Sequence, residues 1–104
     1  MATTNLRLAK GTAPTTLTAV YTVPANTRTC IKSWHVCNKN TAAAKYVTIV
    51  VAGTELIFQY PVPAKDTIHE HPVDQILAAG ETIQVLGESA DLVFYISGRE
   101  EGTA

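Results

Sequence analysis

Residues with β-branched side chains dominate this chain, and they limit what it can fold into more than any other feature does. Thr occurs 15 times, Val ten times and Ile seven times among the 104 residues. These side chains are stiff at χ1 and favour strands. Turn-forming residues recur at short intervals between the β-branched runs, which is typical of an all-β sandwich or barrel. We expect turns at Lys10-Gly11, Pro24-Ala25-Asn26, Asn38-Lys39-Asn40, Gly53, Pro61–Pro63, Gly80 and Glu88–Asp91.

Alternation of residues along the runs predicts where the strands lie. Residues 46–51 and 55–60 flank Gly53 and predict a hairpin, because Gly53 tolerates the positive φ of a tight turn. Further strands are expected at 17–23, 82–86 and 92–97. Neither face of Arg28–Asn38 is cleanly apolar, so this strand either bulges near Ser33 or is covered on both faces. Only Asp74–Ala79 is expected to form a short helical turn, which Gly80 would end.

The expected fold is a single antiparallel β-sandwich, Ig-like or jelly-roll-like, with about seven or eight short strands. The length suits one domain, expected at residues 17–99. Residues 1–16 are expected to form an N-terminal arm with a short strand at Leu6–Leu8, and residues 100–104 a C-terminal tail. Both ends would be disordered in a lone monomer, so we hypothesise that neighbouring subunits hold them.

Charge and hydropathy exclude several kinds of partner. The net charge is −1 and the pI is about 6.3, so no basic footprint for direct contact with nucleic acid is expected. Charged residues make up 16% of the chain, a low content that suits a subunit of an assembly. The longest apolar run, Ile49–Ala52, is far shorter than the roughly 20 residues of a membrane helix. Neither a membrane partner nor a signal peptide is expected.

Cys30 and Cys37 are predicted to remain reduced. On one extended strand they would lie roughly 23 Å apart, well beyond the reach of a disulfide. Neither a CxxC spacing nor a neighbouring base marks them as a redox pair or a nucleophile. Two free thiols fit folding in a reducing cytosol.

His69-Glu70-His71 is the one cluster that could carry chemistry. On a strand the two imidazoles point to the same side and could share a metal ion with Asp74 or His35. Two His residues two apart are common by chance, so we interpret the segment as an exposed polar strand edge or a pH-sensitive subunit contact. We therefore expect no metal site, no cofactor and no enzyme activity.

The Ser and aromatic residues add no catalytic pattern. Ser33 and His35 share a strand face but lack the strand-to-helix elbow of a nucleophile. Trp34 is expected in the core, although stacking on a sugar is an alternative. Tyr60, next to Pro61, is the ring that we expect to be exposed.

Several turn and strand motifs together resemble a known family. They are Val20–Arg28, Ile31-Lys32-Ser33, His35–Asn38, Val62–Thr67, Leu77–Ile83 and Ser89–Leu92. Over residues 17–99 the chain resembles small β-sandwich virion proteins of tailed bacteriophages, of the head-decoration (cement) type or the tail- and neck-associated type. The motifs are structural rather than catalytic.

The resemblance implies a virion structural protein, assembled in the host cytoplasm, that binds the outer shell as a symmetric oligomer. Its partners would be the major capsid protein or other virion proteins. Two alternatives stay open: a tail, neck or fibre module that contacts host glycans, and a metal-dependent enzyme using His35, His69 and His71. The residues expected at partner interfaces are Leu6, Arg7, Leu8, Tyr60, His69 and His71. The first three could add a strand to a neighbour's sheet edge.

Overall fold

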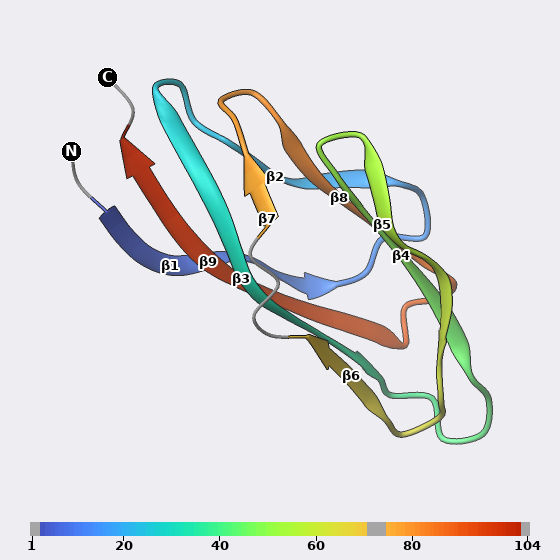
Figure 1. Ribbon diagram of the computed structural model, residues 1–104. Helices are drawn as coiled ribbons and strands as arrows, with labels where there is room; N and C mark the ends of the chain where they lie inside the picture. The colour runs from blue at the N-terminus through green and yellow to red at the C-terminus, as the bar shows by residue number, and fades with distance from the viewer. Residues whose placement is uncertain (1–2, 71–74, 103–104) are drawn as a thin grey trace.

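The computed structural model describes residues 3–70 and 75–102, which form two antiparallel sheets packed face to face (Figure 1). The strands are β1 (Thr3–Thr12), β2 (Thr18–Thr22), β3 (Thr27–Asn38), β4 (Lys45–Val51), β5 (Thr54–Val62), β6 (Thr67–Glu70), β7 (Gln75–Leu77), β8 (Thr82–Gly87) and β9 (Leu92–Gly102). The five-stranded sheet has the order β1-β9-β3-β6, with β7 also paired to β3. The four-stranded sheet has the order β2-β8-β4-β5. The predicted antiparallel β-sandwich is confirmed.

The strands pair in a nested order around one central turn. Ala52 (φ 51°) and Gly53 (φ 80°) form a two-residue hairpin turn with positive φ at both positions, as type I′ geometry requires. Moving outward from this turn, β4 pairs with β5, β3 with β6 and β7, β2 with β8, and β1 with β9. Successive pairs alternate between the two sheets. This connectivity is a jelly roll, one of the two predicted architectures.

The core lies between the inner faces of the two sheets. Trp34 and Phe94 are almost fully buried, which confirms the core position predicted for Trp34. Around them pack aliphatic side chains from both sheets, among them Ile31, Val36, Val47, Ile49, Leu77, Ile83, Val85, Leu92 and Ile96. Cys30 and Cys37 are both free thiols on β3, as predicted. No helix in the described part of the chain is long and apolar enough to cross a membrane.

Two bulges lie opposite the same segment of β9. In β3 the register shifts between Ile31 and Ser33, which confirms the bulge predicted near Ser33. In β1 it shifts between Arg7 and Ala9. Ser97 of β9 pairs with both Arg7 of β1 and Ser33 of β3, and each of these two strands has its one extra residue next to that pair. The outer faces of all three strands therefore stay in phase.

Both chain ends join a sheet of their own subunit, where we expected neighbouring subunits to hold them. β1 pairs along β9 of its own chain, and the register joins Thr3 to Glu101. The bulge at Leu8 buries this side chain and interrupts the alternation along the strand. β1 and β9 both belong to the five-stranded sheet, and the expected division into an arm, a domain at 17–99 and a tail stays a prediction.

The helical turn expected within Asp74–Ala79 is also not found. Gln75–Leu77 forms β7, and Asp74 lies outside the described residues. Leu77 is buried opposite Thr29 of β3, so pairing with this strand and burial of one side chain outweigh the local preference for a helix. Gly80 has a φ of 86° and occupies the turn that leads into β8.

Gly98 marks the tightest backbone approach in the five-stranded sheet. A Cβ at this position would lie 2.4 Å from the Cys30 carbonyl oxygen and 2.8 Å from Leu8 Cδ1. We therefore expect Gly98→Ala to lower the free energy of unfolding by about 1–3 kcal/mol, because the clash involves backbone that cannot move aside cheaply. Gly102→Ala on the same strand is the matched control, since its Cβ would meet no atom within 4 Å. Urea unfolding of both variants measures the difference, and equal stability would contradict the close approach.

Candidate interaction surface

The outer face of the five-stranded sheet carries five basic side chains, one of them Lys32 in the bulge of β3. Side chains alternate along a strand, so residues between the buried positions of β1, β9 and β3 point outward. Arg7 and Lys10 lie on β1, Arg99 on β9 and Arg28 on β3. We call this surface the basic face and define it by these four residues.

The register shows how other outward residues lie among these cations. Ser97 lies between Arg7 and Ser33, and the Ser33 and Ser97 hydroxyl oxygens are 3.0 Å apart. Tyr95, which is 45% exposed, lies between Lys10 and His35. The surface therefore combines cations, hydroxyls and one exposed ring.

Negative charge is scarce on the basic face. Glu101 is its acid among the described residues, and it forms an ion pair with Arg28. Among the residues whose side chains the structure describes, Arg7, Lys10 and Arg99 have no hydrogen-bond or ion-pair partner. The face thus presents unpaired cations to solvent.

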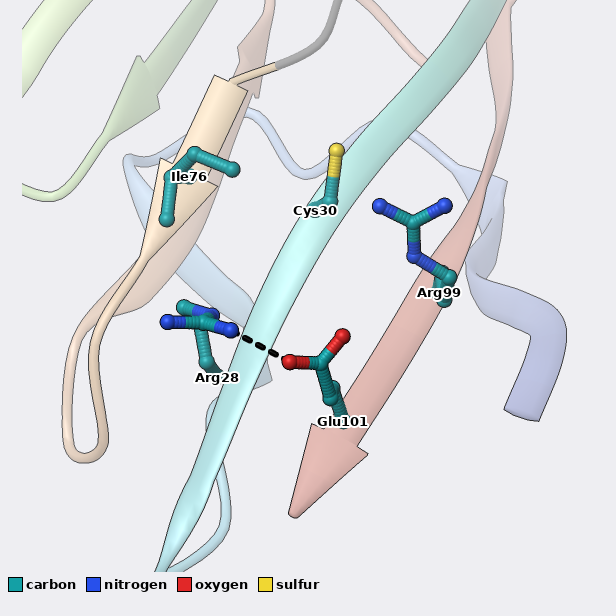
Figure 2. Close-up of a pocket in the computed structure, with 5 residues that line it drawn as sticks. All are labelled: Arg28, Cys30, Ile76, Arg99 and Glu101. Atoms are coloured by element: carbon teal, nitrogen blue, oxygen red, sulfur yellow. Dashed lines mark hydrogen bonds and ion pairs between the residues drawn. The ribbon is translucent and has the colours of Figure 1, made fainter. Parts of the chain in front are cut away.

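A hollow of about 240 Å³ lies at one end of the basic face (Figure 2). It is lined by Arg28, Cys30, Ile76, Arg99 and Glu101. Figure 2 shows Cys30 between Ile76 of β7 and Arg99 of β9, with the Arg28–Glu101 ion pair beside them. Arg28 is already paired with Glu101, so the guanidinium of Arg99 beside the apolar Ile76 is the group that can bind an anion such as a carboxylate or a phosphate.

A second group of exposed apolar side chains lies on the β4–β5 hairpin of the four-stranded sheet. Tyr60 pairs with the buried Val47 and Tyr46 with Pro61, so the two tyrosines lie on opposite sides of the hairpin. Tyr46, Leu56, Phe58 and Tyr60 are 41%, 40%, 65% and 50% exposed. We call these four residues the hairpin patch. Lys45 and Glu55 are the charged residues within the strands of this sheet, and they are the chain neighbours of Tyr46 and Leu56.

The structure distributes the predicted interface residues over both surfaces. Tyr60 is exposed as predicted, although the neighbouring Phe58 is the more exposed ring. Arg7 lies on the basic face, Leu6 is half-buried, and Leu8 is buried in the core. Because β1 is an edge strand, pairing with a neighbour's sheet stays a prediction for its backbone, while the Leu8 side chain is not accessible to a partner.

The His cluster falls largely outside what the structure describes. The backbone of His69 pairs with His35, whereas the His69 side chain and all of His71 lie outside the described residues. Among the side chains that are described, no group of three His, Cys, Asp or Glu residues could hold a metal ion. The subunit contact expected at His69 and His71 stays a prediction.

Tyr21 ties the two sheets together at the end of the sandwich where β2 and β9 meet. Its hydroxyl oxygen lies 2.7 Å from Thr29 Oγ1, and it donates to Glu100 Oε2 at 2.5 Å. Burial, followed by the hydrogen bond to Glu100, raises the pKa of Tyr21 from 10.0 to about 12. The neutral phenol is therefore favoured in the folded protein.

A polar network that the sequence did not reveal holds the loops at the other end. The buried Asn38 side chain donates to the carbonyl oxygens of Ala43 (3.1 Å) and Val62 (2.9 Å). Asn40 Nδ2 donates to Asp91 Oδ2 at 3.0 Å, and this hydrogen bond is the main cause that lowers the pKa of Asp91. The side chains of this network come from two segments that the sequence predicted only as turns, Asn38-Lys39-Asn40 and Ser89-Ala90-Asp91.

The fold is a jelly-roll β-sandwich with exposed basic side chains on one sheet and exposed apolar side chains on the other. No protein-family model and no curated protein matches the sequence. Among solved structures the chain is similar to a pentameric capsid protein isolated from metagenomic phage sequences, at 14% identity with a TM-score of 0.39. A second structure of such a protein gives 14% identity and a TM-score of 0.31.

Each alignment covers 96% of this chain, which spans only 61% and 62% of the two capsid proteins. At these TM-scores the likeness does not establish a shared fold or function.

The raised pKa of Tyr21 predicts a loss of stability in alkaline solution. The pKa of about 12 in the folded protein exceeds the ordinary value of 10.0. The contribution of the neutral Tyr21 phenol to the free energy of unfolding is therefore intact below pH 10 and is lost as the pH rises through 12. Tyr21→Phe should therefore show a smaller decline in unfolding free energy between pH 10 and 12 than the wild type does. Denaturant unfolding at several pH values tests this. Tyr95→Phe leaves the Tyr21–Glu100 pair in place and should decline as the wild type does.

Proposed function

We propose that this protein is a structural subunit of a bacteriophage particle. Specifically, it is a capsid decoration (cement) protein that binds the outside of the shell as a symmetric oligomer and stabilises it. The hairpin patch carries the proposal, because it gives every subunit an apolar surface whose burial favours association. The resemblance of the turn and strand motifs to small virion proteins supports placing the protein in a phage particle.

The hairpin patch suits contacts between side chains rather than addition of a strand. Exposed edge strands are usually protected by charges, proline or bulges. β5 has Pro61, register shifts opposite Val47–Val50 and a positive φ at Gln59, so its backbone is a poor template for another strand. Phe58 and Tyr60 still project large apolar surfaces, which matches the aromatic enrichment of protein interfaces.

The proposed mechanism is burial of surface at subunit seams. A stable interface takes about 800 Å² from each partner, which is roughly a seventh of the 5550 Å² exposed by this subunit. Each apolar Å² removed from water contributes about 25 cal/mol. Repeated around a shell, such contacts oppose separation of the shell subunits without any chemical step.

The exposed rings of the hairpin patch also favour a second candidate function. Tyr46, Phe58 and Tyr60 could stack on sugar rings. A tail, neck or fibre module that contacts host glycans would use them in this way. The two candidates differ in how many copies each particle contains.

Copy number tests the location on the particle. For a decoration protein we expect a ratio to the major shell protein typical of a shell component, because every equivalent seam is occupied. Quantitative mass spectrometry of purified particles measures this ratio. A few copies per particle would favour the tail or neck alternative, and absence from particles would refute a virion role.

Self-association through the hairpin patch is tested by removing its two most exposed rings. We expect the wild type to sediment as an oligomer and the double variant Phe58→Ser, Tyr60→Ser to shift toward the monomer, because it loses apolar contact area. Sedimentation velocity over a concentration series measures the change. Ile76→Ser is the matched control, since Ile76 is 58% exposed but lies on the other sheet. A wild type that stays monomeric, or a control that dissociates equally, would contradict the assignment.

A further inference from the structure

The segregation of unpaired cations on the outer face of the five-stranded sheet points to a partner. We infer that the basic face binds the carboxylate groups of an acidic protein surface. Arg7 and Arg99 contribute most, because they lie on adjacent strands and have no ion-pair partner among the described side chains.

The arrangement places cations at regular intervals across three strands. In the register, Arg7 is opposite Ser97 and Arg28 is opposite Glu101, so each is offset by two residues from Arg99. With strands about 4.8 Å apart and a rise of about 3.3 Å per residue, Arg99 lies roughly 8 Å from each. Such spacing allows separate carboxylates to be bound at the same time.

The hollow provides one site within this surface where an ion pair gains strength. Ile76 and Cys30 border the guanidinium of Arg99, so a bound carboxylate would be partly shielded from water. Less solvent strengthens a charge-assisted hydrogen bond, and arginine can bind a carboxylate with two parallel hydrogen bonds.

A second copy of this chain is a poor source of the carboxylates. Except for Glu55, the acidic side chains that the structure describes already interact within their own subunit. Asp66, Glu81 and Glu88 accept hydrogen bonds from backbone amides, Asp91 from Asn40 and Ser89, Glu100 from Tyr21, and Glu101 from Arg28. Two basic faces would also repel each other. The anions therefore come from a different molecule.

The composition of the face favours a protein partner over a nucleic acid. Three of the five cations on this outer face are arginines, and Tyr95 and Ile76 are exposed beside them. Arginine and tyrosine are enriched at protein interfaces, whereas lysine is depleted.

This inference deepens the proposed function, since it names the surface that would face an acidic patch on the shell. It rests on the proposed function only for where that partner is found. The test uses the isolated protein, so its failure is distinguishable from absence of the protein from particles.

Binding to poly-L-glutamate tests the basic face directly. We expect the wild type to bind the polymer at low ionic strength and the double variant Arg7→Gln, Arg99→Gln to bind at least tenfold more weakly. Isothermal titration calorimetry measures both affinities. The control Lys39→Gln, Lys65→Gln removes the same charge from loops outside this sheet and should change the affinity less than twofold.

Three results would overturn the inference. The first is no binding of poly-L-glutamate by the wild type at low ionic strength. The second is an equal loss in both double variants, which would mean that overall charge and not the basic face determines binding. The third is tighter binding of a single-stranded oligothymidine of equal charge, which would indicate a nucleic-acid surface instead. Circular dichroism of both variants confirms that each is folded.

Discussion

The pairing of β3 with β9 is the interaction on which the rest of the structure depends. β9 lies between β1 and β3, so its register with both strands decides which residues face the core and which face solvent. Gly98 permits the approach, since any Cβ there would overlap the Cys30 carbonyl oxygen. The same register buries Trp34 opposite Ile96 and places Arg28 opposite Glu101. Core and basic face are therefore two consequences of one pairing.

The bulges show how this pairing keeps a long sheet coherent. A single extra residue in one strand would move every later side chain to the other face. Here β1 and β3 each contain one extra residue beside Ser97, and the bulge leaves this residue unpaired. The outward residues of both strands therefore remain opposite the outward residues of β9. Leu8 thereby enters the core, while Arg7 stays outside next to Ser97. The local irregularity is thus what allows three strands to form one continuous outer surface.

Local chemistry accounts for what the sequence could predict. Gly53 adopts the expected positive φ, a turn forms at Pro24-Ala25-Asn26, and of the two alternatives for the mixed faces around Ser33 the strand has the bulge. The short strands at the edges of the fold were harder to predict from the sequence. β7 is only three residues long, so its pairing with β3 outweighs any periodicity. The basic face could not be predicted from a net charge of −1, because Arg7, Arg28 and Arg99 come together only through the register of β1, β3 and β9.

The two surfaces lie on different sheets and rely on different physics. Burial at the hairpin patch depends on apolar area and responds weakly to salt, since the strands of its sheet contain only Lys45 and Glu55 as charged residues. Ion pairs at the basic face are screened over about 10 Å at 0.1 M salt. In the proposed assembly a subunit would associate with its own kind through one sheet and bind an acidic partner through the other. Raising the ionic strength would weaken the second contact and leave the first nearly unchanged.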